Sequence, residues 1–490
     1  MKRLVIISFA TVAMGFGFGQ IGDGPVVKKH VSQSDIEAGN MGLPEIFSAG
    51  HDLFNAKFNM FDGQGRPGTT GGGAARTPGS APLFIRTSAP DSNSCGGCHN
   101  DPFSGGAGDI VANVFVLAQV LDPVTESISA DFSDFRNTLG MQGSGPIEML
   151  AREMTADLQA IKDMTLAEAT TSGSTVTHDL VTKGVHFGSI TAHADGSVDS
   201  SAVDGVDKDL IIKPFHQKGA VISLREFTNN AMNHHHGIQS VERFGVDRTG
   251  THDFDQDGVE DEFTVGDVSA TTIYQAALNV PGQVIPRDPV FEKAIINGEE
   301  TFKAIGCDGC HVAELTLNDP VFTEPNPYNK AGDLQVSQVS HLFSFDLRSE
   351  GQMPRLESKG TGAVVRAFTD LKRHNLCDDE LQHFCNEKVV QAGIPTEEFL
   401  TRKLWDVGNS APYGHVGDLT TITEAIYFHG GEARSTRDAF FALSQHEQDE
   451  VVEFLKSLQM LPPDTASLIV DENMQPRSKP SRRNLPDFKN

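Results

Sequence analysis

The chain is long and acidic: of its 490 residues, 39 are Lys or Arg and 66 are Asp or Glu, which gives a formal net charge of −27 at pH 7. Such a charge disfavours binding to nucleic acid or to an anionic membrane surface and suits a positively charged protein partner. The length is sufficient for two or three domains, and the remaining composition is that of an ordinary globular chain.

The first residues are typical of an export signal. Lys2 and Arg3 precede an apolar run, Leu4–Phe18, and small glycine residues stand just before Gln20. The run is too short and too rich in glycine for a membrane-spanning helix, so we expect a cleaved signal peptide over residues 1–19. Because no later segment approaches about 18 uninterrupted apolar residues, we expect no integral membrane span.

Two copies of the motif Cys-x-x-Cys-His indicate which chemistry the chain supports. The first follows an amphipathic stretch over residues 47–58 and a glycine-rich loop, and the second lies far along the chain. In this motif two cysteines add across the vinyl groups of one porphyrin, and the histidine becomes the proximal iron ligand. A redox-active pair, half a zinc site and a disulfide are alternatives, but two copies in a chain with six cysteines favour haem. We therefore predict two covalently bound haem c groups, held by Cys95, Cys98, His99, Cys307, Cys310 and His311.

A strongly helical pattern follows the first motif. Apolar residues recur at helical spacing over residues 147–161, as expected for a helix with one buried face. Residues 170–209 are rich in Ser, Thr, Asp and Gly with short β-branched runs, which indicates loops and strands. We therefore expect an N-terminal haem domain over residues 20–285 with a large, partly β insertion at about 165–285.

Three consecutive histidines, His234–His236, lie in this insertion. They can belong to a polar loop in which one ring packs by chance. Alternatively, one of them lies on the distal side of a haem, as ligand or as acid/base. Because three neighbours on a regular element cannot all point one way, at most one or two can serve. The sequence leaves both interpretations open.

An acidic segment in the same insertion resembles the first half of a calcium-binding loop. Carboxylates stand at loop positions 1, 3 and 5, and a glycine follows at position 6, the pattern that converges oxygen ligands on Ca²⁺. Position 12 is Thr264 instead of the closing glutamate, and Asp261 can substitute for it. We expect a calcium site ahead of a plain acidic turn, with the ligands Asp253, Asp255, Asp257 and Asp261.

The C-terminal part is predicted to be helical around the second motif. A helical pattern over residues 291–305 leads directly into the motif, and capping boxes begin two later helices at Thr421–Glu424 and Ser444–Glu447. These features predict a cytochrome c-like haem domain over residues 286–465, followed by a Pro- and Ser-rich tail at 466–490 that we expect to be disordered. The predicted fold class is therefore mainly α: two cytochrome c-like haem domains with irregular loops and the partly β insertion.

The two remaining cysteines, Cys377 and Cys385, stand at short spacing. In an oxidising compartment a disulfide between them is the expected state.

Covalent haem is attached after export, so the signal peptide and the haem motifs both predict a periplasmic location.

Several segments resemble one protein family. They read "SCGGCHNDPFSGG", "FKAIGCDGCHVAEL", "VDKDLIIKPF", "FTDLKRHNLC", "KLWDVGNSAPYGHVGDLTTITEAIYFHGGEA" and "LSQHEQDEVVEFLKSL". Together, over residues 45–462, they are similar to the di-haem oxidoreductases, also described as peroxidases or thiol oxidoreductases. That family is in turn similar to bacterial di-haem cytochrome c peroxidases. The resemblance implies two cytochrome c-like domains, in which one haem collects electrons and the other, with an open or opening sixth site, reduces peroxide.

The resemblance leaves the sixth ligand of the second haem open. The family often has a methionine where this chain has Leu376, which excludes a thioether ligand from that position, whereas His415 is kept among altered neighbours. The candidates for the second haem are His374, Met353 and His415. Glu148, in "GSGPIEMLARE", resembles the glutamate of a peroxidase segment and is the candidate acid/base for peroxide cleavage. The start of a helix also favours a glutamate without any catalytic role.

These features predict a periplasmic di-haem c-type oxidoreductase of the peroxidase type. We expect its partners to be a small electron-donor protein or a quinol-linked cytochrome, together with a small oxidant as substrate, and no nucleic acid. One alternative is an electron-transfer cytochrome in which both haems are six-coordinate. Another is the oxidation of a protein or small molecule through high-valent haem. The sixth ligands distinguish the enzyme from the electron carrier.

Overall fold

The computed structural model describes residues 22–65, 92–108, 111–114, 134–385 and 390–480. The predicted signal peptide over residues 1–19 therefore lies outside the described part. The fold has 36% helix and 15% strand, and its strands form two- and three-stranded sheets. The expectation of a mainly α fold is thus wrong in part. The long connections between helices pair with one another, which satisfies their backbone N–H and C=O groups and makes the fold mixed α/β.

The helices and strands follow one another in short elements, with one long exception. The helices are α1 (Gln33–Glu37), α2 (Leu43–Asn55), α3 (Ser144–Ser172), α4 (Leu224–Ala231), α5 (Val241–Phe244), α6 (Val246–Thr249), α7 (Val265–Ala277), α8 (Pro289–Ala304), α9 (Ile422–Tyr427), α10 (Arg434–Ala442) and α11 (Gln445–Ser457). The strands are β1 (Val111–Val114), β2 (Asp134–Asn137), β3 (Val176–Thr182), β4 (Val185–Ala192), β5 (Val198–Asp199), β6 (Gly282–Val284), β7 (Leu315–Leu317), β8 (Val321–Glu324), β9 (Phe343–Asp346), β10 (Glu357–Lys359), β11 (Gly362–Val365), β12 (Arg373–Asn375), β13 (Glu398–Leu400), β14 (Leu458–Gln459) and β15 (Ile469–Val470).

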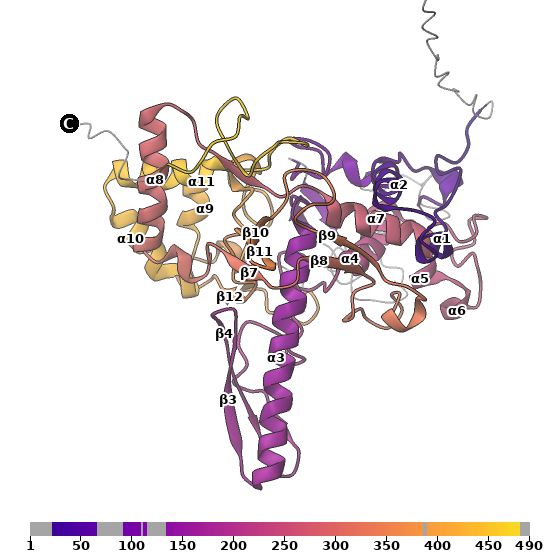
Figure 1. Cartoon of the computed structure of the whole chain (residues 1–490), viewed down its shortest axis with the longest axis horizontal. Helices are drawn as coiled ribbons and strands as arrows, with labels where there is room; N and C mark the ends of the chain where they lie inside the picture. The colour runs from indigo at the N-terminus through magenta and orange to yellow at the C-terminus, as the bar shows by residue number, and fades with distance from the viewer. Residues whose placement is uncertain (1–21, 66–91, 109–110, 115–133, 386–389, 481–490) are drawn as a thin grey trace, which may run out of the picture.

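A helix precedes each Cys-x-x-Cys-His motif in the chain. A later helix packs against this helix at a glycine. Before the first motif, α2 packs on α7 (Figure 1), and a Cβ atom added at Gly50 would lie 2.2 Å from the carbonyl oxygen of Ala270. Before the second motif, α8 packs on α11, and a Cβ atom at Gly298 would lie 1.9 Å from the carbonyl oxygen of Glu450. The absent side chains let the helix backbones touch. The two halves thus repeat one arrangement, while the domain boundary near residue 285 stays a prediction.

Helix α3 and the hairpin β3–β4 form an arm that projects from the rest of the molecule (Figure 1). The helix contains the predicted segment 147–161 and extends beyond it to Gly173, whose φ of 65° is left-handed and ends the helix. Strands β3, β4 and β5 form an antiparallel sheet beside it, with Leu180, Phe187 and Ile190 buried. The strands expected between residues 170 and 209 are therefore confirmed.

The helices predicted in the C-terminal part are confirmed. Capping boxes begin α9 at Thr421 and α11 at Ser444, and α8 leads into the second motif. A buried apolar cluster that includes Phe302, Phe368 and Phe454 joins these helices. Within the described residues, no helix is both long enough and apolar enough to cross a membrane.

The tail differs from the expectation up to residue 480. It was predicted to be disordered from residue 466, but β15 pairs in parallel with β6 and Val470 is buried in a small apolar cluster. Arg477 also donates to the carboxylate of Glu292 at 2.8 Å. Apolar burial and this ion pair hold the segment against the second half of the chain, so the prediction is wrong here; residues beyond 480 lie outside the described part.

Candidate functional site

Both Cys-x-x-Cys-His motifs open on one shared cavity of about 450 Å³. Each motif forms a single 3-10 turn, Cys95–Gly97 and Cys307–Gly309, which brings its two cysteines within one helical turn. The four motif cysteines line the cavity and are not joined in disulfides. Burial raises the pKa of Cys95 and of Cys307 to about 12, which keeps both thiols protonated. Neutral thiols at the edge of a large cavity suit covalent attachment of a group that fills it.

The histidine of each motif is part-buried and is fixed by a backbone carbonyl. Nδ1 of His99 donates to the carbonyl oxygen of Leu139 at 2.9 Å, and Nδ1 of His311 donates to that of Phe368 at 3.1 Å. Burial lowers the pKa of both rings to about 4, so both are neutral at pH 7. With Nδ1 protonated and bonded, Nε2 carries the lone pair that a metal ligand needs. Both rings are prepared in the same way for axial ligation.

A further histidine on the cavity wall, His429, has the same properties. It follows the end of α9, its Nδ1 donates to the carbonyl oxygen of Ala425 at 2.7 Å, and burial lowers its pKa. Burial is the largest cause of the lowered pKa of His311, and electrostatic repulsion by His429 is the second. The two rings therefore lie within electrostatic range of each other. The Nε2 atom of His429 is therefore left for a ligand in the part of the cavity beside the second motif.

His374 lies on the cavity wall, but both of its ring nitrogens are engaged. Nε2 donates to Asp370 and Nδ1 donates to Glu432, both at 2.8 Å. Burial by itself lowers the pKa of His374, but hydrogen bonds to Asp370, Cys310 and Glu432 outweigh it and raise the pKa to about 11. A protonated ring with two carboxylate partners has no lone pair for iron. The structure therefore does not offer His374 as a sixth ligand.

The other two predicted sixth ligands differ from each other. The side chain of Met353 is 39% exposed and does not line the cavity, so its thioether is not available to the second haem. His415 is buried on the cavity wall beside the rings of Phe384 and Phe399, and burial lowers its pKa to about 3. Neither ring nitrogen of His415 has a hydrogen-bond partner among the described residues. His415 is thus available to a bound group, whereas Met353 is not.

The three consecutive histidines form one turn of π-helix, Met232–His236, directly after α4. Nδ1 of His236 donates to the carbonyl oxygen of Ser92 at 2.7 Å, and its Nε2 lies 3.5 Å from Sγ of Cys95. His236 therefore borders the first motif at its cysteine. Such π turns occur frequently at functional sites.

His235, in the same turn, lines the cavity near the first motif. Burial is the largest cause that lowers the pKa of His99 to about 4 and that of His216 to about 3, and electrostatic repulsion by His235 is the second cause for both. His235 therefore lies within electrostatic range of both rings. Of the two interpretations that the sequence left open, this position favours the one in which a histidine of the run faces the first haem site.

Glu148, the predicted acid/base, is fully buried but does not line the cavity. One carboxylate oxygen accepts hydrogen bonds from Arg152 at 2.5 Å and from Asn326 at 2.8 Å. The other accepts from the backbone N–H of Leu224 at 2.7 Å. Because both oxygens are satisfied inside the protein, Glu148 has a structural role in this fold and is not placed to exchange protons with a substrate.

Three of the four predicted calcium ligands lie together. Asp253, Asp255 and Asp257 each bring one carboxylate oxygen within 4.8 Å of the others, and Asp253 accepts hydrogen bonds from two N–H groups inside the loop. Burial raises the pKa of Asp257, and the neighbouring Asp253 adds to the effect. Asp261 is bonded instead to His252 at 2.9 Å, so it does not join the cluster.

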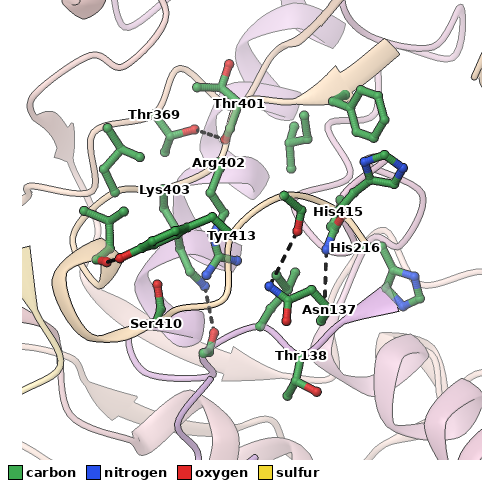
Figure 2. Close-up of a pocket in the computed structure, with 18 of the residues that line it drawn as sticks. Asn137, Thr138, His216, Thr369, Thr401, Arg402, Lys403, Ser410, Tyr413 and His415 are labelled. Atoms are coloured by element: carbon green, nitrogen blue, oxygen red, sulfur yellow. Dashed lines mark hydrogen bonds between the residues drawn. The ribbon is translucent and has the colours of Figure 1, made fainter. Parts of the chain in front are cut away.

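The wall of the cavity carries polar groups that fit a porphyrin. Both nitrogens of His415, Oδ1 of Asn137 and Oε1 of Gln217 are buried and have no hydrogen-bond partner within the described ranges. Figure 2 shows Asn137 and His415 in one part of this wall, with Arg402 and Lys403 in the same view. Burial lowers the pKa of Lys403 to about 8. Haem is an apolar disc with two carboxylates, and the basic side chains of Arg402 and Lys403 can pair with those carboxylates, whereas the amide oxygens of Asn137 and Gln217 only accept hydrogen bonds.

His429 is absent from the ligands predicted by sequence. It stands in "FHGGEA", where the two glycines indicate a tight turn but carry no information about a cavity built from distant segments. The signal that could have found it is its place immediately after the capped helix α9, within the most specific block of the family resemblance.

Comparison with known proteins supports the haem interpretation for part of the chain. Residues 361–458 match the model of the family described as "Di-haem oxidoreductase, putative peroxidase", and this segment contains His374, His415 and His429. The predicted resemblance to the di-haem oxidoreductases is therefore confirmed over these residues. No curated protein matches the sequence. Among solved structures, Kuenenia stuttgartiensis hydrazine synthase pressurised with xenon aligns with a TM-score of 0.38 at 12% identity, covering 94% of this chain and 100% of that chain.

Proposed function

We propose that this protein is a periplasmic di-haem c-type oxidoreductase of the peroxidase type. The observation that carries the proposal is the shared cavity on which both motifs open, with His99 and His311 fixed alike by backbone carbonyls. The family match over residues 361–458 supports a haem-linked oxidoreductase. Bound haem supplies the one-electron redox chemistry, while the protein supplies ligands, orientation and proton transfer.

The second site is a bis-histidine site that collects electrons. His311 and His429 would hold the iron of the second haem, because each is part-buried and neutral at pH 7 and has Nδ1 bonded to a carbonyl. A pair of histidines keeps the haem potential lower than a histidine–methionine pair. A fixed ligand set also limits rearrangement during electron transfer. The missing methionine at Leu376 is therefore compensated by a histidine from another turn.

The first site is the catalytic one. His99 would hold the iron, and His235 on the π turn lines the cavity near the first motif. His235 takes the proton from one peroxide oxygen and returns it to the departing oxygen, the role first expected of Glu148.

One observation also favours an electron carrier. Because His235 lies near His99, its ring can serve as the sixth ligand of the first site instead of as an acid/base. Both sites would then be six-coordinate, and the protein would pass electrons without binding an oxidant.

The remaining expectations concern partners and ions. The net charge of −27 suits a basic electron donor, either a small donor protein or a quinol-linked cytochrome. A calcium ion held by Asp253, Asp255 and Asp257 would neutralise the clustered carboxylates. Hydrogen peroxide, or a similar small oxidant, is the proposed substrate.

Steady-state kinetics with hydrogen peroxide and a reduced donor test this function in the holoprotein. We expect the half-reduced protein to contain one high-spin haem that binds cyanide, and His235→Ala to lower kcat about 100-fold or more. His446→Ala is the matched control, because the side chain of His446 is 83% exposed. Two low-spin haems in every redox state, with neither cyanide binding nor turnover, would identify an electron carrier instead.

A further inference from the structure

The turn that carries His429 is bonded to strand β12 (Arg373–Asn375) through one glutamate. The two carboxylate oxygens of Glu432 accept separate hydrogen bonds, one from the backbone N–H of Asn375 and one from Nδ1 of His374, both at 2.8 Å. The turn therefore cannot leave the strand without breaking a bidentate, charge-assisted contact.

The two glycines after His429 let the turn approach this strand closely. Gly430 donates from its N–H to the carbonyl oxygen of Leu376 at 3.0 Å. A Cβ atom at Gly431, whose φ is 54°, would lie 2.4 Å from the carbonyl oxygen of Asn375. A side chain at this second glycine would therefore both strain the backbone and clash with β12. Position 376 thus contributes a backbone carbonyl, and its side chain need not be a methionine.

The other ring nitrogen of His374 is held from inside the protein. Nε2 donates to Asp370, whose side chain is 3% exposed, whereas the side chain of Glu432 on the other side is 48% exposed. The same segment begins at Phe368, whose carbonyl fixes the proximal ligand His311. The segment from Phe368 to His374 is therefore hydrogen-bonded to His311 at its first residue and to the turn of His429 at its last residue.

We propose that His374 and Glu432 form a latch that holds His429 in place as the sixth ligand of the second haem. This inference rests on the ligation by His429 proposed above. Both are positioning residues, since they act on the iron only through the turn. Between two carboxylates His374 stays protonated, which strengthens both bonds. Because Glu432 is half-exposed, it is the part of the latch that solvent can reach first.

The latch is tested by spectroscopy and cyanide titration of the ferric holoprotein. Glu432→Ala and His374→Ala should each convert part of the second haem to high spin. They should also tighten its apparent cyanide affinity by about 10- to 100-fold, as expected for losing a hydrogen bond to a charged group. Glu432→Gln and His374→Gln, which keep hydrogen-bonding atoms, should shift the same signals less.

Glu447→Ala is the matched control. Glu447 likewise accepts a backbone hydrogen bond, from Ser444 at 2.9 Å, but at the start of α11. We expect this variant to lose stability and to keep the wild-type spectrum and cyanide affinity. Wild-type spectra and affinity in both latch alanine variants would overturn the proposal.

A separate variant distinguishes failure of the latch from failure of the ligation. If His429→Ala removes the low-spin signal of the second haem while the latch variants keep it, the latch is overturned and the ligation stands. If His429→Ala leaves that signal unchanged, His429 is not the ligand and both proposals fail. Should the alanine variants not fold, the two glutamine variants decide, because a wild-type cyanide affinity in both would contradict the latch.

Discussion

A histidine that serves as a sixth iron ligand must be neutral and held so that one ring nitrogen stays free, and the part-buried His429 meets these conditions. Burial lowers its pKa, and the carbonyl oxygen of Ala425 takes its Nδ1 proton. His374 is also buried, but two carboxylates keep it protonated and occupy both of its nitrogens. The neighbouring groups, and not the residue type, therefore separate a metal ligand from a structural cation.

Glu148→Ala should destabilise the protein without slowing peroxide turnover. The change would leave the buried charge of Arg152 without its partner, and removing one member of a buried ion pair costs about 3–5 kcal/mol. Chemical denaturation of the holoprotein measures the free energy of unfolding, and turnover is measured where the variant stays folded. Wild-type stability combined with turnover slowed about 100-fold would instead make Glu148 the acid/base.

His374 should also make stability depend on pH. Bonds that outweigh burial raise its pKa from 6.5 to about 11 in the folded protein. A group with a raised folded-state pKa stabilises the fold fully below its unfolded pKa, and this contribution is lost as pH rises through the folded pKa. The Tm advantage of the wild type over His374→Gln should therefore shrink as pH rises from 6.5 toward 11. An advantage independent of pH would contradict the assignment.

At the residue scale, the two Cys-x-x-Cys-His motifs predict only the iron ligands that lie within them. His99 and His311 follow directly from Cys-x-x-Cys-His, and the cavity on which both open agrees with that prediction. The proposed partner of His311 could not be predicted, because tertiary structure brings His429 to the same cavity. The sequence could not show that Glu148 is enclosed by Arg152 and Asn326 either, since Asn326 lies far along the chain.

Two helix crossings position the haem motifs. In the second half, α8 touches α11 where Gly298 meets the backbone of Glu450. A glycine in a helix interior costs stability on its own, so its presence here reflects the close approach. The helix that carries the motif is thereby fixed against the C-terminal helix.

Gly298→Ala should therefore destabilise the protein. The new Cβ atom would lie 1.9 Å from the carbonyl oxygen of Glu450, and overpacking of this kind costs about 1–3 kcal/mol, more than the helix propensity gained. Ser435→Ala is the control, because Ser435 is exposed on α10. Thermal unfolding of both holoprotein variants checks the prediction, and equal Tm values for the two variants would contradict it.

The acidic loop should respond to calcium. If Asp253, Asp255 and Asp257 hold the ion, a chelator should lower the Tm of the wild type, and added calcium should restore it by mass action. Asp255→Ala should remove this response, whereas Asp261→Ala should keep it, since Asp261 is bonded to His252. A Tm indifferent to both chelator and calcium would leave the segment as an acidic turn.

Periodicity and capping signals predicted the helices well. The segments at 147–161 and 291–305 and the capping boxes before α9 and α11 are confirmed, because these signals are local. The predicted disulfide between Cys377 and Cys385 is also confirmed. The small sheets and the ordered tail were underestimated, since pairs such as β6 with β15 join segments far apart in sequence.

At the scale of the whole molecule, one cavity joins the two halves. Each half contributes a helix crossing, a motif and a part-buried histidine fixed by a carbonyl. The wall of this cavity comes from separate segments, among them those that carry Asn137, His216 and His415 (Figure 2). Sequence alone predicts two haem motifs and cannot say that they share a space, because that depends on how the halves pack.

The intact mass of the matured protein tests the central claim most directly. We expect the mass of the polypeptide plus two haems, because both cysteine pairs line the cavity. Replacing Cys95 and Cys98 with alanine should remove one haem, and replacing Cys307 and Cys310 should remove the other. A fully matured wild-type protein that carries fewer than two haems, or variants that keep both, would contradict the account.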